Sequence, residues 1–448
     1  MWHQSWTWFR ESLTLDRWLS KSTPNSLRKD MAAGLTVGVM LIPQAMAYAV
    51  IAGLPPIYGL YGALVPLLVY PIFGTSRQLA IGPQALDMLI LAAGLGAVVE
   101  VGTGEYVGMA IIVTAMVGVL QIAMGAMQLG FVANLLSRPV IAGLTSAAAL
   151  IISFSQLGSL LGVDLGNSQY VHVVLWRAVQ HLGEVHLLSM GIGAVGVAIL
   201  LGLPRWLPAV PEALVVVALA TVASYAFAFE QQGVAVVGSI PEGLPPITLP
   251  ALSFNTLDTL LPAAVTLALV QFMKNVSLGR VFATRHGYTI DANRELVGLG
   301  SANLVGSFFS SIPVSGSFSR SAVNDQTGAQ TPLANWFTAG VIALTLLFLT
   351  PLFYYLPLPA LAAIIIVAGI GLIDLHELRN LFKARRRDGY IALFTAGCTL
   401  FIGIQEGILL GIGASVIAVL FRISRPNMAE LGHVPGTRLF RDLDRFDQ

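Results

Sequence analysis

Uncharged apolar runs of membrane-spanning length recur along almost the whole chain. The first, residues 31–53, holds 23 residues without a charged side chain, and about 20 apolar residues suffice to cross the hydrocarbon core of a bilayer. Charged residues make up 10% of the sequence, whereas soluble domains carry roughly 25%. A chain so poor in charge cannot cover a water-exposed surface, so the sequence predicts an all-α polytopic membrane protein.

The apolar runs predict about 14 transmembrane segments. They are residues 31–53, 57–73, 79–97, 106–127, 132–156, 187–203, 213–229, 260–273, 296–309, 310–330, 333–353, 360–373, 390–404 and 408–421. Cytoplasmic loops of membrane proteins are enriched in Lys and Arg. With both termini in the cytoplasm, this count places nearly every basic loop residue inside, Arg177 being the exception.

Composition excludes several classes of function. The formal net charge of +1 gives no electrostatic basis for nucleic-acid binding, and the single cysteine, Cys398, rules out a disulfide framework or a Cys-based metal cluster. The seven histidines are scattered without ligand spacing, so no metal or cofactor is predicted. No cluster of His, Asp, Glu and Ser suggests an enzyme.

The tenth segment, Ser310–Gln330, is unlike its neighbours because it is rich in Ser and Gly and carries Arg320 at its centre. Ser residues favour helix N-caps, and a helix N-terminus beside an arginine can bind an anion. The third segment is also short and is interrupted by Gly82 and Pro83. Paired short or broken segments in two halves of a chain are the best sequence indication of a transporter site.

Two stretches resemble the sulfate permease (SulP) family, the anion transporters that include pendrin and prestin. They are PQAMAYAVIAGLPPIYGLYGALVPLLVYPIFGTSRQLAIGP, residues 43–83, and NRELVGLGSANLVGSFFSSIPVSGSFSRSAVNDQTGAQTPLA, residues 293–334. The resemblance implies a 7+7 inverted repeat with a core domain of segments 1–4 and 8–11 and a gate domain of segments 5–7 and 12–14. It also implies that segments 3 and 10 are each a short strand leading into a half-helix.

This reading divides the chain into five parts. Residues 1–30 are an N-terminal interfacial or cytoplasmic segment, 31–230 the first repeat, 231–257 a linker loop, 258–424 the second repeat, and 425–448 a cytoplasmic linker to an absent STAS domain. The resemblance implies a bacterial inner-membrane protein and a homodimer.

Six residues are predicted to bind the substrate: Gln44, Tyr48, Gln84, Ser317, Ser319 and Arg320. The alternatives are an interfacial arginine, ordinary N-capping by the serines, and interhelical hydrogen bonding by Gln44 and Tyr48.

Two further charged residues lie in or next to predicted segments. Asp87 is a candidate proton carrier, a partner for Arg320, or a structural hydrogen-bonding group. Lys274 stands where many family members have a glutamate, and it either adds positive charge near the site or extends to the cytoplasmic surface.

The predicted function is secondary active transport of an anion of the sulfate, bicarbonate or dicarboxylate type, by movement of the core against the gate. Proton-coupled symport is the predicted mode. An anion exchanger, or an anion channel or uniporter on the same fold, is the alternative.

Overall fold

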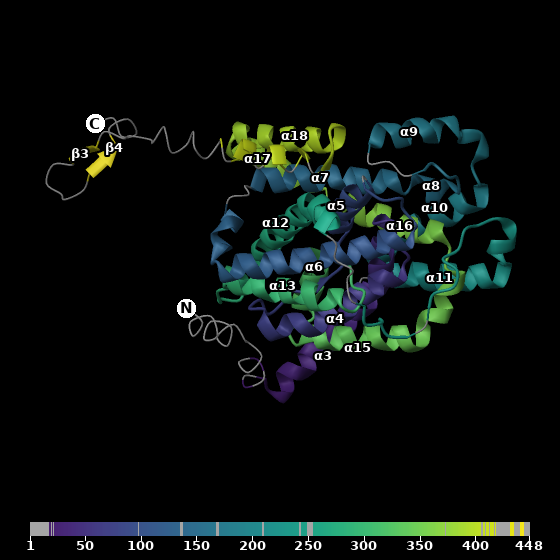
Figure 1. Cartoon of the computed structure of the whole chain (residues 1–448), viewed down its shortest axis with the longest axis horizontal. Coiled ribbons are helices and arrows are strands. Elements are labelled where there is room, and N and C mark those ends of the chain that lie inside the picture. The colour runs from purple at the N-terminus through teal and green to yellow at the C-terminus, as the bar shows by residue number, and fades with distance from the viewer. Residues whose placement is uncertain are drawn as a thin grey trace.

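Helices make up most of the chain, as the sequence predicts (Figure 1). The computed structural model describes residues 22–404 except 97, 135–137, 167–169, 208–209, 242, 249–253 and 372, and outside that stretch Trp18, Ser20, 406–407, 409–411, 413–415, 417, 431–433 and 440–442. The α-helices are α3 (Pro24–Ile51), α4 (Ile57–Phe73), α5 (Ala85–Gly96), α6 (Gly104–Ala126), α7 (Arg138–Ser155), α8 (Leu157–Leu161), α9 (Val171–Gln180), α10 (Leu187–Trp206), α11 (Glu212–Phe227), α12 (Phe254–Arg285), α13 (Ala292–Ser307), α14 (Phe318–Gln326), α15 (Ala334–Leu344), α16 (Leu358–Ile370), α17 (Leu375–Ala384) and α18 (Arg386–Phe401). The strands form two separate pairs, β1 (Ile81–Gly82) with β2 (Ser315–Gly316), and β3 (Leu431–His433) with β4 (Phe440–Asp442).

Seven helices in this part of the chain are long and apolar enough to cross a bilayer, among them α3, α6, α10 and α12. Helices α4, α5 and α11 are apolar but shorter. Each of the first thirteen predicted segments coincides with a helix, whereas the fourteenth, 408–421, lies largely outside the described residues. The helical membrane fold is therefore confirmed, and the count of fourteen crossings stays a prediction.

Helices α3 and α12 extend beyond the predicted segments. Helix α3 begins at Pro24 rather than at residue 31, because Thr23 and Ser26 form a capping box in which each side chain accepts from the other's backbone N–H. Helix α12 continues through Lys274 to Arg285 instead of ending at residue 273. Its lysine has a buried partner, so the charge does not end the helix.

Long helices pack in pairs that are distant in sequence. Helix α6 lies along α13, α3 along α15, and α7 along α18, and Figure 1 shows α17 and α18 beside α7 on the side of the molecule opposite α3 and α15. The largest apolar cluster draws residues from α3, α4, α5, α12 and α16. The half-helix α5 is thus enclosed by longer helices, whereas α14 packs against α3 and leaves Phe318 66% exposed.

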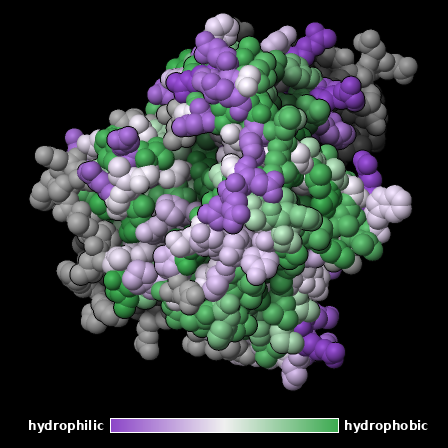
Figure 2. Space-filling model, turned by 90° about the vertical axis from the view of Figure 1, so that its right-hand side faces the viewer, coloured by the Kyte–Doolittle hydropathy of each residue, from purple (hydrophilic) through white to green (hydrophobic). Residues whose placement is uncertain are grey.

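The outer surface carries large apolar side chains. On α10 and α11, Leu201 is 56% exposed and Val222 is 66% exposed. Figure 2 views the molecule from the right-hand side of Figure 1 and shows broad hydrophobic areas on that face. Such a surface suits lipid rather than water, since monomeric soluble proteins rarely expose contiguous apolar patches larger than a few hundred Å².

Candidate functional site

Strands β1 and β2 pair antiparallel at the centre of the molecule. Ile81 lies opposite Gly316, and Gly82 lies opposite Ser315. Helix α5 begins at Ala85, just after β1, and α14 begins at Phe318, just after β2. Since the two strands run in opposite directions, the two helices start beside one another and leave in opposite directions. The first N–H groups of a helix have no partner within it and carry partial positive charge. The arrangement therefore brings two positive helix ends to one place.

Buried amide side chains hold β2 in position. Asn275 of α12 accepts a hydrogen bond from the Gly316 N–H at 2.8 Å, and Asn303 of α13 accepts one from the Val314 N–H at 2.8 Å. A Cβ atom on Gly316 would lie 2.5 Å from the Asn275 Oδ1 atom. Only glycine therefore fits at this point of the strand.

The approach to β1 is held in the same way from α14 and α15. Asn324 donates to the Gln78 carbonyl and Asn335 to the Leu79 carbonyl, each at 3.0 Å, and Ser321 accepts from the Ala80 N–H at 2.9 Å. Consecutive backbone groups of this extended segment thus find partners on α14 and α15. The backbone of β1 is therefore held from the second half of the chain.

Two buried carboxylates hold the loops that lead into the site in place by hydrogen bonds. Glu295 of α13 accepts from the Thr75 N–H, the Thr75 hydroxyl, the Ser76 N–H and the Tyr70 hydroxyl, at 2.6 to 2.9 Å. Asp30 of α3 accepts in the same way from the backbone of Gln330 and Thr331. These contacts give Glu295 and Asp30 a structural role.

Arg320 is completely buried at the start of α14. Its Nη1 atom donates to the Gln44 Oε1 atom at 3.2 Å, and its Nη2 atom donates to the Pro83 carbonyl at 3.1 Å. Its Nε–H has no hydrogen-bond partner in the described part of the chain. The arginine therefore bridges α3 and the entry to α5 and keeps one donor unused.

The two predicted serines lie at the N-terminus of α14. The Ser317 hydroxyl caps the helix by accepting from the Arg320 N–H at 3.4 Å, and it lies 3.2 Å from the Ser319 hydroxyl. Ser317 is buried, whereas Ser319 is exposed. N-capping by Ser317 is confirmed, and substrate binding by either serine stays a prediction.

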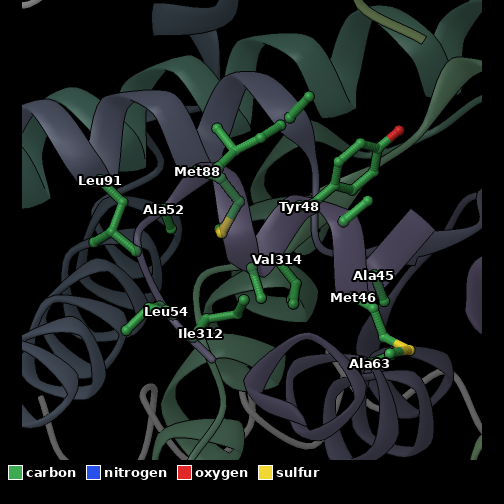
Figure 3. Close-up of a cluster of buried hydrophobic side chains, with 14 of the residues drawn as sticks. Ala45, Met46, Tyr48, Ala52, Leu54, Ala63, Met88, Leu91, Ile312 and Val314 are labelled. Carbon is green, nitrogen blue, oxygen red and sulfur yellow. The ribbon is translucent and has the colours of Figure 1, made fainter. Parts of the chain in front are cut away.

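Two of the other predicted binding residues, Gln44 and Tyr48, interact with Arg320, and Gln84 follows Pro83, whose carbonyl accepts from Arg320. Gln44 and Tyr48 are one helical turn apart on α3, and Figure 3 shows the Tyr48 hydroxyl pointing away from the apolar side chains of Met88 and Val314. Gln84 precedes α5, and its buried Nε2 atom has no hydrogen-bond partner among the described residues. The unused donors of Gln84 and Arg320 both lie where α3, α5 and α14 meet. Buried donors without acceptors are uncommon in proteins, and substrate binding by these residues stays a prediction.

Asp87 and Lys274 form an ion pair next to this site. The Lys274 Nζ atom donates to the Asp87 Oδ1 atom at 2.9 Å, and the Ser315 hydroxyl and the Gln271 amide donate to Oδ2. Asp87 is fully buried, whereas the Lys274 side chain is 22% exposed. Its hydrogen bonds give Asp87 a structural role, whereas its roles as a proton carrier and as a partner for Arg320 stay predictions. The expectation that Lys274 extends to the cytoplasmic surface is wrong, because the buried carboxylate holds its ammonium group inside.

Sequence reasoning missed the buried amides. Gln121 donates to Gln271, and Asn303 donates to both, which links α6, α12 and α13 beneath β2. Their signal in the sequence was a set of amides within otherwise apolar segments, a pattern that also occurs at ordinary helix contacts. No group of three His, Cys, Asp or Glu side chains in the described residues could hold a metal ion.

Comparison with known proteins agrees with this geometry. Residues 27–395 match the profile of the Sulfate permease family. Sulfate transporter 4.1, chloroplastic, of Arabidopsis thaliana is 39% identical over 425 residues, which cover 94% of this chain and 62% of that protein. A probable sulfate transporter of Mycobacterium tuberculosis is 36% identical over 422 residues, which cover 94% of this chain and 75% of that protein. The chain thus spans less than two thirds of the Arabidopsis relative. These relatives are named as transporters, not enzymes.

Two solved structures share the fold. The murine Slc26a9 anion transporter in the inward-facing state superposes with a TM-score of 0.89 at 25% identity, covering 99% of this chain and 76% of that one. The transmembrane domain of the cyanobacterial bicarbonate transporter BicA superposes with a TM-score of 0.76 at 25% identity, covering 88% of this chain and 99% of that one.

Proposed function

Because the chain belongs to the sulfate permease family, we propose that it is a secondary transporter that carries a small anion through the site between α5 and α14. The observation that carries this proposal is the fully buried Arg320, which keeps an unpaired Nε–H beside two helix N-termini. A charged side chain within a membrane is costly unless it meets an opposite charge or lines a wet cavity. An anion supplies that charge.

We propose that the substrate contacts are Arg320, Ser317, Ser319, Gln84, Gln44 and Tyr48. These groups offer hydrogen-bond donors and one positive charge, which suits an oxyanion. The relatives are named as sulfate transporters, and one structural neighbour is named as a bicarbonate transporter. Sulfate, bicarbonate and dicarboxylates are therefore the anions to test first.

Transport requires the site to open to each side of the membrane in turn. We propose an inverted repeat in which a core, α3–α6 with α12–α15, moves against a gate built from α7, α10, α11, α16 and α18. Crosswise packing supports the repeat: α3 contacts α14 and α15, whereas α12 contacts α5 and α6. The gate helices contact one another in the pairs α7–α18, α7–α16 and α10–α16. Residues 1–30 and 425–448 are proposed to be cytoplasmic.

The coupling mode is a separate question. Proton symport, the mode predicted from the sequence, needs a group that takes up a proton with the anion, and Asp87 was the candidate. In this structure the Asp87 carboxylate is paired with the Lys274 ammonium. That observation favours the alternative mode, anion exchange or uniport, as the second proposal.

One reconstitution experiment tests the function. Vesicles containing the purified protein are loaded with unlabelled anion and assayed for counterflow of labelled sulfate, bicarbonate, chloride and fumarate, with uracil as a neutral control. Saturable counterflow of at least one anion is expected. Ohmic unitary currents without counterflow would instead identify a channel, and the absence of any anion flux would refute the proposal. Acceleration of uptake by an inward proton gradient would favour symport over exchange.

A further inference from the structure

We infer that the Lys274 ammonium neutralises the Asp87 carboxylate. This ion pair keeps the net charge of the anion site constant, so that anion binding does not depend on pH. The inference rests on the proposed function and concerns how that same site sets its charge. Lys274 is a positioning residue here, since it acts through Asp87 and need not touch the anion.

The ion pair is part of the framework that builds the site. Asp87 lies in the first turn of α5, four residues after Pro83, whose carbonyl accepts from Arg320. Its second carboxylate oxygen accepts from Ser315 of β2, which pairs with Gly82. Asp87 is therefore about one helical turn, roughly 6 Å, from a direct contact of Arg320.

An unpaired carboxylate so close to Arg320 would oppose the function of the site. For an anion about 7 Å from the Asp87 carboxylate, slightly beyond its separation from Pro83, a unit charge at an effective dielectric constant of about 20 changes the binding constant about 50-fold. The Lys274 ammonium cancels most of this effect because it lies 2.9 Å from the carboxylate. The site then keeps the single positive charge of Arg320.

Among the described residues of the neighbouring helices, Arg320 of α14 is the other cation that interacts with Asp87. It is already hydrogen bonded to Gln44 and Pro83, and the titratable side chain of α3 beside it is Tyr48. Helices α6 and α13 contribute the neutral Gln121 and Asn303 to the network, while Glu295 lies behind Asn275. Residues 139–155 of α7, which also packs on α5, include no titratable side chain. Lys274 is thus the cation that contacts the Asp87 carboxylate directly.

The consequence is that removal of the lysine should create proton dependence. In Lys274→Gln, the Asp87 carboxylate keeps the Ser315 and Gln271 donors but loses its cation. A proton from the solvent then adds to a carboxylate oxygen before the anion binds, and it returns to solvent when the anion leaves. The wild-type protein needs no such proton.

The test compares pH profiles of uptake into vesicles at about pH 5.5 and about pH 7.5. It uses the anion that the wild-type protein carries, with sulfate and chloride preferred because their charges are constant over this range. A flat profile is expected for the wild type and for Lys274→Arg. Lys274→Gln should lose about 50-fold in anion affinity at the higher pH and recover most of it at the lower pH. The double variant Lys274→Gln/Asp87→Asn should again be flat.

Two results would overturn the inference: a Lys274→Gln profile as flat as that of the wild type, or a wild-type profile that rises steeply with acidity. If Lys274→Gln does not fold, Asp87→Asn serves instead. It leaves the ammonium uncompensated, so tighter anion binding is expected, and unchanged affinity would contradict the inference. Wild-type vesicles that carry no anion of the panel would refute the proposed function itself, which separates the two failures.

Discussion

Replacement of Arg320 by methionine is the sharpest test of the anion site. Methionine is unbranched and adaptable, so it fills most of the space of the buried arginine without its charge. The change removes two hydrogen bonds, to Gln44 at 3.2 Å and to the Pro83 carbonyl at 3.1 Å. It also removes the one positive charge that the paired Lys274 and Asp87 leave at the site.

The expected loss follows from Coulomb's law. A unit charge about 4 Å from an anion contributes about 4 kcal/mol at an effective dielectric constant of about 20, which corresponds to roughly a thousandfold in binding. Water that enters the space left by the guanidinium restores part of this binding free energy, so we expect the affinity for the anion to fall at least about 100-fold. Folding should be retained, because removing a buried, incompletely hydrogen-bonded charge also removes its desolvation cost.

The assay is anion uptake into vesicles over a range of substrate concentrations, with thermal unfolding of the detergent-solubilised protein as the folding control. Arg205→Met on α10 is the matched control, since that arginine is exposed and belongs to the proposed gate. Arg320→Lys should recover part of the affinity because it restores the charge but not the planar donor geometry. Uptake by folded Arg320→Met at the wild-type rate would refute the placement of the anion at this arginine.

Three further substitutions test the framework of the site. Gly316→Ala should abolish uptake and cost about 1–3 kcal/mol of stability, because its Cβ would press on Asn275 at 2.5 Å; Gly340→Ala, with open space around it, is the control. Ser317→Ala should weaken the start of α14 by about 1 kcal/mol and lower uptake in parallel, and an unchanged unfolding temperature would contradict the capping role. Glu295→Ala should lower the unfolding temperature by the equivalent of about 3 kcal/mol, since it leaves several buried donors without an acceptor; a wild-type melting curve would refute that accounting.

Apolar run length and the positions of Gly, Pro and Ser were enough to locate most of the helices. Those features predicted α4 at residues 57–73 and the two broken segments around Gly82 and Gly316. The signal is strong because a bilayer allows few alternatives to a closed helix. Run length alone did not reveal that Lys274 has a buried partner, so it did not settle how far α12 continues past Lys274.

The sequence by itself determined that this chain crosses a membrane and that it has two interrupted segments, and it predicted Arg320 as the charge around which a site forms. Only the tertiary structure decided which buried polar groups pair with one another. Arg320 is hydrogen bonded to Gln44 and to the Pro83 carbonyl, and Asp87 forms an ion pair with Lys274. The physical reason is that run length and residue type act locally along the chain. The pairing of buried polar groups depends on which helices meet, and those partners are as far apart in sequence as Asp87 and Lys274.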